Sequence, residues 1–135
     1  MRYIHQRITI IKFRKPVKKD INEDLQWFGS SLGLFNLRDR NSSCFRVFIE
    51  LVKSSRKKKP LSSDELAYRT GLSRGTVIHH LNKLINSGIV INEKNKYILR
   101  VENLKVLVEE IEKDIKRTCS DLKEIAKNID DELGL

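Results

Sequence analysis

The chain has 135 residues, a formal net charge of +9 and a pI of about 9.7. Hydrophobic residues make up 39% and charged residues 33%, which suits one small core with a highly charged surface. No apolar run approaches the roughly 20 residues of a membrane span, and the basic N-terminus lacks the apolar stretch of a secretory signal, so we expect a cytoplasmic, nucleoid-associated protein with a polyanionic partner and no membrane contact.

The positive charge is concentrated in the first three quarters of the chain. Residues 1–19 hold seven Lys/Arg and no acid, and residues 20–100 hold fourteen basic and eight acidic residues. Residues 101–135 hold six basic and ten acidic residues. This division is typical of a body that binds nucleic acid and keeps a separate acidic element away from the phosphates.

The stretch "ITIIKF" (Ile8–Phe13) is short and β-branched, and it predicts a strand that ends before Pro16. We expect its apolar side chains to pack or pair with the body, while flanking cations stay available to phosphates. A solvated, unstructured leader is the alternative. The apolar side chains are Ile8, Ile10, Ile11 and Phe13, and the cations are Arg2, Arg7, Arg14, Lys15, Lys18 and Lys19.

The sequence predicts two helices before residue 56. The basic run "RKKK" (56–59) that follows suits either a loop that contacts phosphates or a solvated turn. Asp20 or Asn22 caps the first helix, and two glycines end it. After the polar loop "NLRDRNSS", Ser42 or Ser43 caps the second. The glycines are Gly29 and Gly33, and the expected apolar faces are Ile21, Leu25 and Phe28, then Phe45, Phe48, Ile49 and Val52.

The densest signal is "LSSDELAYRTGLSRGTVIHHLNKLINSGIV", which predicts two helices joined by a tight turn. Ser62 or Ser63 caps the first helix, Gly71 ends it, Ser73 caps the second, and Gly88 stops that one. A short connection containing glycine lets two helices cross steeply, as in a helix-turn-helix. The apolar stripe of the second helix is Val77, Leu81, Leu84 and Ile85.

A hairpin and one long helix complete the chain. "IVINEKNKYIL" predicts two short strands around Glu93-Lys94-Asn95. The helix from Asn103 to Glu132 carries apolar residues in steps of four and three, interrupted at Thr118, which predicts a seam. The seam could pair two chains or fold back on its own domain; its length and acidic remainder favour dimerisation. Its residues are Leu104, Val108, Ile111, Ile115, Leu122, Ile125 and Ile129.

The stretch "LSRGTVIHHLNKLINSGIV" (Leu72–Val90) resembles the recognition helix of ArsR-type winged-helix transcription regulators, which often read "LS-x-x-TV-S-HHL-x-x-L-x-x-AG-[IL]-V". The chain is more distantly similar to MarR-type regulators, and as a whole it resembles small archaeal winged-helix proteins. The resemblance covers roughly residues 42–100 and implies a winged helix-turn-helix that binds DNA. It says nothing about a particular operator.

Two positions depart from the ArsR pattern. Metal-sensing members carry a Cys-x-Cys motif in the first helix of the pair, but the matching stretch "DELAYRTG" (64–71) has neither Cys nor His. Metal sensing at that place is therefore not implied. Ile78 stands where the family usually has Ser, and it either touches a thymine methyl group or widens the core.

The resemblance and the helix pattern together suggest a set of DNA contacts. Arg74 could donate two hydrogen bonds to one guanine, whereas Lys83 is better placed to contact a phosphate. The hairpin lysines would reach the minor groove or the DNA backbone. His79 lies opposite the apolar stripe, whereas His80 lies on its flank, where packing against the hairpin is equally open. The proposed DNA-binding residues are Ser73, Arg74, Thr76, His79, His80, Lys83, Lys94 and Lys96.

No metal, cofactor or catalytic site is predicted. His79 and His80 are neighbours on a helix and point about 100° apart, and zinc needs three or four converging ligands. Neither histidine has a recognisable nucleophile or carboxylate partner. Cys44 and Cys119 have no ligand-like spacing and are interpreted as reduced and structural, with an intermolecular disulfide left open. The aromatics Trp27, Phe28 and Phe35 are expected in the core or a dimer contact.

The sequence thus predicts a mainly α (α+β) winged helix-turn-helix protein, with a short β-hairpin wing and a long C-terminal dimerisation helix. Residues 1–41 form a basic strand and short helix, residues 42–100 bind DNA, and residues 101–135 dimerise. The expected function is a homodimeric, sequence-specific regulator of transcription that binds double-stranded DNA, with no enzymatic activity and no effector identified. The alternatives are an architectural, chromatin-like DNA-binding protein and a winged-helix adaptor in the transcription machinery.

Overall fold

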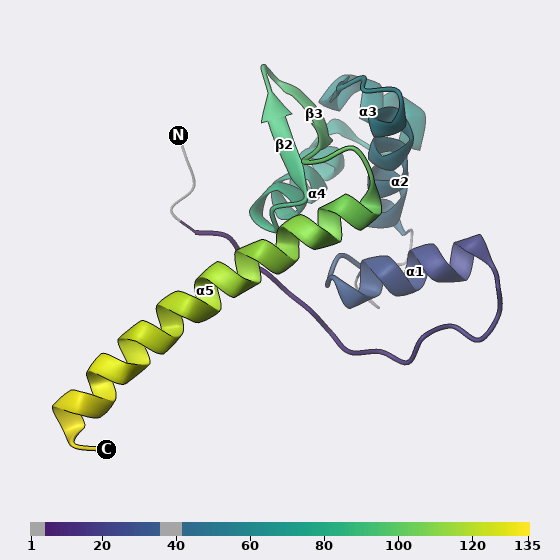
Figure 1. The fold of residues 1–135 in the computed structure, drawn as a ribbon. Helices are drawn as coiled ribbons and strands as arrows, with labels where there is room; N and C mark the ends of the chain where they lie inside the picture. The colour runs from purple at the N-terminus through teal and green to yellow at the C-terminus, as the bar shows by residue number, and fades with distance from the viewer. Residues whose placement is uncertain (1–4, 36–41) are drawn as a thin grey trace.

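The computed structural model describes residues 5–35 and 42–135. These ranges contain five helices and a three-stranded antiparallel sheet; the hairpin of residues 90–99 stands at one side of the body, and the last helix projects from it (Figure 1). The predicted α+β winged helix-turn-helix is confirmed. Arg2 and most of the predicted polar loop lie outside the described residues. The elements are α1 (Ile21–Ser31), α2 (Ser43–Arg56), β1 (Leu61–Ser62), α3 (Ser63–Thr70), α4 (Arg74–Asn86), β2 (Val90–Glu93), β3 (Lys96–Leu99) and α5 (Leu104–Leu133).

Helices α2, α3 and α4 enclose the core. The predicted stripe of α4 is confirmed: Val77, Leu81 and Leu84 are fully buried, and Ile85 is half-buried against the core. The predicted face of α2 is wrong by a partial rotation of the helix. Its buried apolar residues are Cys44, Val47, Phe48 and Leu51, whereas Phe45, Ile49 and Val52 are only half-buried.

Both ends of α3 and the start of α4 form as their residue types predict. The Ser62 side chain accepts from the Glu65 backbone N–H, and the Glu65 carboxylate accepts from the Ser62 N–H, which closes a capping box at the start of α3. These hydrogen bonds lower the pKa of Glu65. Gly71 ends α3 with φ of 70°, in the left-handed region that glycine enters without steric cost, and Ser73 caps α4.

The wing is the hairpin of β2 and β3. The strand order is β1-β3-β2, with Val90 opposite Leu99 and Glu93 opposite Lys96. The turn has only two residues, Lys94 and Asn95, and both have positive φ (52° and 65°). Two successive residues with positive φ give the type of turn that fits the twist of a tight hairpin, so the wing has a defined tip.

Helix α1 does not end at Gly29, as the sequence suggested, but continues to Ser31. Gly29 is needed for packing instead: a Cβ atom there would lie 1.9 Å from the ring of Phe35. That ring packs edge-on against Phe45 and Phe48, with centroid distances of 5.1 and 6.3 Å. The close approach explains how α1 rests on α2.

We therefore expect Gly29→Ala to destabilise the fold. The Phe35 ring is held by two other rings and has to move, so overpacking should cost about 1–3 kcal/mol in urea unfolding. Gly75→Ala is the matched control, because a Cβ atom at that helical position meets nothing within 4 Å. It should leave stability equal or slightly higher. Equal effects at both positions would contradict the packing argument.

The arm, residues 5–20, is not the predicted strand, because it carries no strand pairing. It contacts the body at single points: the Arg7 N–H donates to the Asn86 carbonyl (2.9 Å) and the Ile11 N–H to the Ser31 carbonyl (2.7 Å). Of its apolar residues, Ile8 packs on the core, whereas Ile10, Ile11 and Phe13 are exposed. Its backbone N–H groups donate to carbonyls at the ends of α4 and α1, so the described part of the arm joins no strand.

Helix α5 has two different halves. In its first half Leu107 and Ile111 are buried in the chain's own core, and Leu104 and Ile115 pack against it. From Lys116 onward all residues are exposed, and this half projects away from the body (Figure 1). Within the described residues, no helix combines the length and the apolar character needed to cross a membrane.

Candidate nucleic-acid interface

Helix α4 presents one apolar and one polar face. Val77, Leu81 and Leu84 fix it to the core, while Arg74, His79 and other polar residues point outward. Ile78 packs against the core, which is one of the two alternatives open from the sequence. A helix of this kind can enter a major groove, because the scaffold holds one face while the other meets base edges.

Hydrogen bonds with the N-cap residue fix the first turn of α4. The Ser73 hydroxyl accepts from the Thr76 N–H (3.1 Å) and lies 2.9 Å from the Thr76 hydroxyl, so both residues shape the helix start. Arg74 is exposed, and its Nε lies 3.6 Å from the Asp64 carboxylate of α3. Exposed ion pairs of this kind contribute little to the free energy of folding. Arg74 can therefore leave Asp64 and contact another acceptor with a small loss of free energy.

Two of the predicted DNA contacts turn toward the body. The His80 Nε2 atom lies 2.7 Å from the Ser43 hydroxyl at the start of α2. The Lys83 ammonium donates to the Leu34 carbonyl (3.2 Å). Both side chains are half-buried and link α4 to its neighbours. His80 therefore packs against α2 and not against the hairpin, as the sequence alternative had it, and Lys83 lies at the edge of the outward face.

The wing carries its two predicted lysines in exposed positions. Lys94 occupies the turn and Lys96 begins β3. The Asn92 side chain accepts from the Asn95 N–H (2.9 Å), which fixes the turn that presents Lys94. A cation at the tip of a rigid hairpin is suited to contact a phosphate or a groove wall beside α4.

The structure places the arm beside α4, a position that sequence reasoning did not give, although it expected Arg7 to stay available to phosphates. His5 and Arg7 lie beside His79, Asn82 and Asn86 across a cleft of about 580 Å³. The only advance signal was the basic charge of the first 19 residues, which does not say where the arm lies. Hydrogen bonds from Gln6 and from the Arg7 backbone fix its position.

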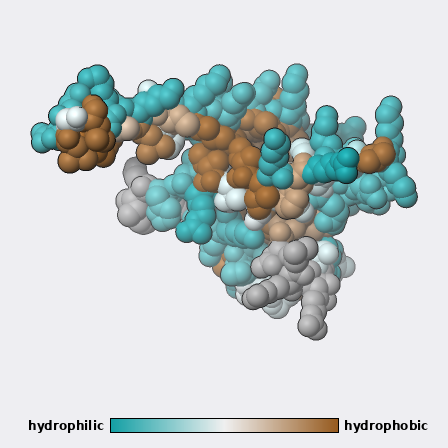
Figure 2. Space-filling model, turned by 90° about the horizontal axis from the view of Figure 1, so that it is seen from below, coloured by the Kyte–Doolittle hydropathy of each residue, from teal (hydrophilic) through white to brown (hydrophobic). Residues whose placement is uncertain are grey.

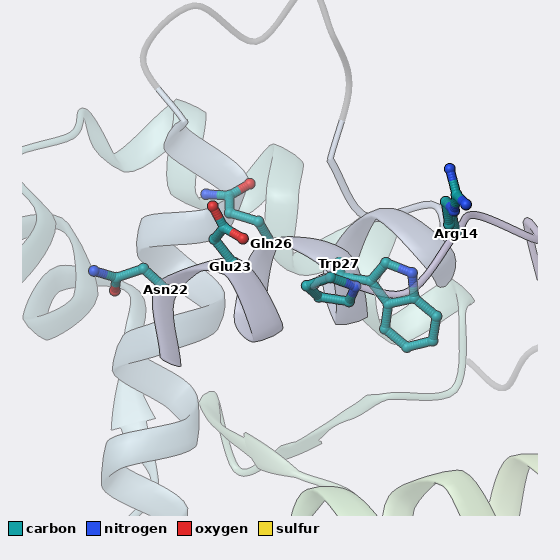
Figure 3. Close-up of a pocket in the computed structure, with 6 residues that line it drawn as sticks. Arg14, Asn22, Glu23, Gln26 and Trp27 are labelled. Carbon is teal, nitrogen blue, oxygen red and sulfur yellow. The ribbon is translucent and has the colours of Figure 1, made fainter. Parts of the chain in front are cut away.

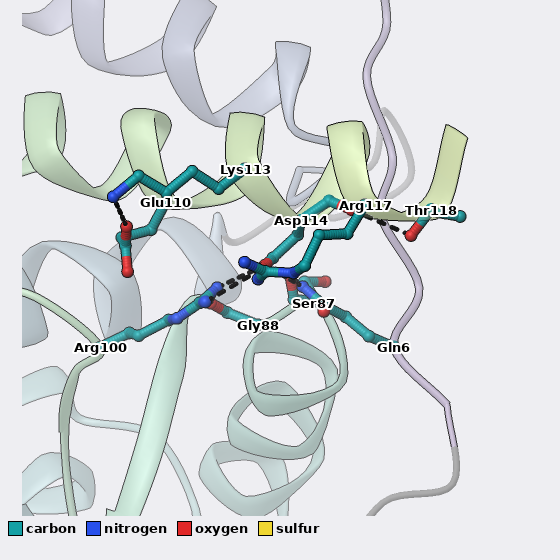
Figure 4. Close-up of polar contacts among 9 residues, drawn as sticks. All are labelled: Gln6, Ser87, Gly88, Arg100, Glu110, Lys113, Asp114, Arg117 and Thr118. Carbon is teal, nitrogen blue, oxygen red and sulfur yellow. Dashed lines mark hydrogen bonds and ion pairs between the residues drawn. The ribbon is translucent and has the colours of Figure 1, made fainter. Parts of the chain in front are cut away.

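A buried carboxylate ties the arm, the wing and α5 together (Figure 4). Asp114, only 7% exposed, accepts two hydrogen bonds from Arg100 at the base of the wing (2.6 and 3.1 Å). It also accepts from Arg117 and from the Gln6 amide of the arm. The hydrogen bonds from Arg100 lower the pKa of Asp114 and raise the pKa of Arg100. This cluster fixes the wing relative to α5.

The aromatic residues serve mainly as packing groups. Phe28 stacks on Phe48 with centroids 6.3 Å apart, and Phe35 joins the same cluster. The Trp27 indole N–H donates to the Phe13 carbonyl (3.3 Å), where the arm crosses α1. The depression beside Trp27 has a volume of about 380 Å³ and is also lined by Arg14 (Figure 3). Arg14 thus lies against α1 and not in the cleft beside α4.

The projecting half of α5 exposes the second part of the predicted seam. Leu122, Ile125 and Ile129 are 62, 54 and 50% exposed, and Leu133 extends the row. Figure 2 shows apolar surface at this projecting end. Of the other seam residues, Val108 is exposed, whereas Leu104, Ile111 and Ile115 contact the chain's own core. Among the described residues, no three His, Cys, Asp or Glu side chains lie close enough to hold a metal ion.

The middle of the chain matches a known protein family. Residues 50–92 match the model of the arsR family of bacterial regulatory proteins. The matched segment starts in α2, covers α3 and α4 and reaches β2, so it includes the whole helix-turn-helix. No curated protein and no solved structure matches the chain.

Proposed function

We propose that this chain, a DNA-binding transcription regulator with a winged helix-turn-helix domain of the ArsR type, acts as a homodimer that prefers a particular DNA sequence. The observation that carries the proposal is the exposed polar face of α4, with the cationic arm beside it. In this proposal residues 42–100 bind DNA, the end of α5 pairs two chains, and the arm extends the DNA contact.

The outward face of α4 supports sequence preference. Arg74 and His79 are exposed near the start and middle of the helix, where side chains of a recognition helix reach base edges. Arg can contact guanine through two hydrogen bonds. Lys94 and Lys96 stand on the wing and suit phosphates, which contribute affinity without sequence information. His80 and Lys83, which already have partners in the body, are not in this base-reading set.

The projecting half of α5 supports the dimer. Leu122, Ile125 and Ile129 follow the three-and-four spacing of a helical interface, yet the chain itself leaves them exposed. A second copy would bury the row and remove apolar surface from water, worth about 25 cal/mol per Å². The acidic residues around the row would then stay away from the DNA phosphates.

Selection of bound DNA from a random pool tests the proposal. A dimeric regulator should enrich an inverted repeat with half-sites about 10 base pairs apart, centre to centre, or a multiple of that distance. Tight binding without any enriched sequence would instead indicate the architectural alternative. The absence of DNA binding at low salt would contradict both and favour a protein-interaction adaptor.

Arg74→Ala and Lys94→Asn should separate base reading from phosphate contact. Arg74→Ala should cost about 1–3 kcal/mol on the selected site and much less on random DNA. Lys94→Asn, which keeps a residue tolerant of positive φ, should weaken both complexes about equally. Asp64→Asn is the control, because it removes the exposed partner of Arg74 and leaves the arginine in place. Fluorescence anisotropy on both DNAs measures these differences; equal losses for Arg74→Ala would exclude it from base reading.

A further inference from the structure

The cleft between the arm and α4 is lined mainly by polar residues. It has a volume of about 580 Å³, and none of the described residues that line it is acidic. Cationic, imidazole, hydroxyl and amide groups converge there from two segments far apart in the sequence. The polar residues that line it are His5, Arg7, Thr9, His79, Asn82, Lys83, Asn86 and Ser87.

Hydrogen bonds to the body fix the position of the arm and therefore of its side chains. The Arg7 N–H donates to the Asn86 carbonyl, and the Gln6 amide donates to the Ser87 carbonyl (3.2 Å) and to Asp114 (3.2 Å). A Cβ atom at Gly88, whose φ is +78°, would lie 2.1 Å from the Gln6 amide nitrogen. The glycine that stops α4 therefore also makes room for the arm.

The charge of the cleft suits an anion with several oxygen acceptors. The C-terminal end of a helix normally repels anions, because its last carbonyls are unpaired. Here the arm satisfies the Asn86 and Ser87 carbonyls, which reduces that repulsion. The Arg7 guanidinium and the Asn82 amide remain as donors, since their side chains are exposed.

We propose that this cleft binds a phosphodiester of the DNA backbone, with Arg7 of the arm as its main charged ligand and Asn82 of α4 as a neutral one. The proposal rests on the proposed function, in which the first turns of α4 enter the major groove. The last turns then lie at the rim of the groove, where the phosphates are. The arm and α4 would hold one DNA strand between them and fix the register of α4.

The test compares two arginines of the same arm. Arg7→Gln should lower DNA affinity and reduce the slope of log K against log salt by about 0.9, the value for one lost phosphate contact. Arg14→Gln is the matched control, because Arg14 is seven residues further along the arm and lies against α1 beside Trp27 (Figure 3). It removes the same charge and should leave the slope unchanged. Asn82→Ala should weaken binding without changing the slope.

Neither arginine substitution should change the melting temperature, since the Arg7 anchor is a backbone hydrogen bond. Equal salt slopes for Arg7→Gln and Arg14→Gln would overturn the cleft proposal while leaving DNA binding intact. Inorganic phosphate at constant ionic strength gives a second measurement. If phosphate raises the melting temperature only when Arg7 is present, and Arg7→Gln leaves the DNA slope unchanged, the cleft binds a free anion and the proposal is overturned. A wild-type protein that binds no DNA would defeat the proposed function itself.

Discussion

Replacing Leu122 and Ile129 by aspartate should convert the protein from a dimer into a folded monomer. Both side chains lie in the exposed row of α5, where a second chain would bury them. A buried carboxylate without a partner costs several kcal/mol, and a symmetric dimer would contain four. Sedimentation velocity at micromolar concentration measures the change in mass. Circular dichroism should show a folded body, because neither residue belongs to the core.

A control on the opposite face of α5 separates this effect from a general change in charge. Ser120→Asp together with Lys127→Gln alters the net charge by the same two units, but these positions point away from the apolar row. This variant should remain dimeric. A wild-type protein that sediments as a monomer, or a control that dissociates as readily as the double aspartate variant, would contradict the helix interface.

Asp114→Ala should be among the most destabilising single substitutions in the chain. It removes the two hydrogen bonds that Arg100, whose side chain is 26% exposed, makes to the carboxylate, and it removes one hydrogen bond of Gln6 in the arm. Removing one partner of a buried ion pair typically lowers the free energy of unfolding by about 3–5 kcal/mol. Because Arg100 is partly exposed, we expect a loss of about 2–3 kcal/mol in urea unfolding. Asp131→Ala is the control, since it breaks an exposed pair with Lys127 (3.0 Å) and should cost less than about 0.5 kcal/mol.

The contribution of Asp114 should also depend on pH with a definite sign. The folded state lowers the pKa of Asp114, so its contribution is fully present above the ordinary aspartate value of about 3.9. It is lost as the pH falls through the lower pKa of the folded state. The stability difference between wild type and Asp114→Asn should therefore be constant from pH 7 to about 5 and shrink below about pH 4. A difference that shrank above pH 5 would contradict the lowered pKa.

The helix-turn-helix could be predicted in detail because its signals are local. Ser62, Glu65, Gly71 and Ser73 act within one or two turns of their own positions, so their residue types determine where α3 ends and α4 begins. The spacing of the buried row in α4 is local as well. The two-residue turn of the wing follows the same rule, since an Asn in a short polar gap favours positive φ.

The arm and the Asp114 cluster could not be predicted in this way. "ITIIKF" has the composition of a strand, but strand formation depends on a neighbouring strand, and the arm's backbone N–H groups instead donate to carbonyls at the ends of α4 and α1. Gln6 and Asp114 are 108 positions apart, a separation that no periodicity describes. One signal was available: Asp114 follows Leu107 and Ile111 in the inward row of α5, and an acid at such a position usually has a buried partner. The sequence did not indicate that Arg100 was that partner.

The projecting half of α5 has a consequence for how the protein responds to its own concentration. Helical segments of about 15 residues without tertiary contacts are only marginally stable in water. In the proposed dimer, the last turns of α5 would therefore become fully ordered only on association, and amide hydrogen exchange there would slow as the protein concentration rises. An operator with two half-sites would have the same effect at high dilution, since it brings two chains together. Assembly on DNA would thus complete the folding of the helix that joins the chains.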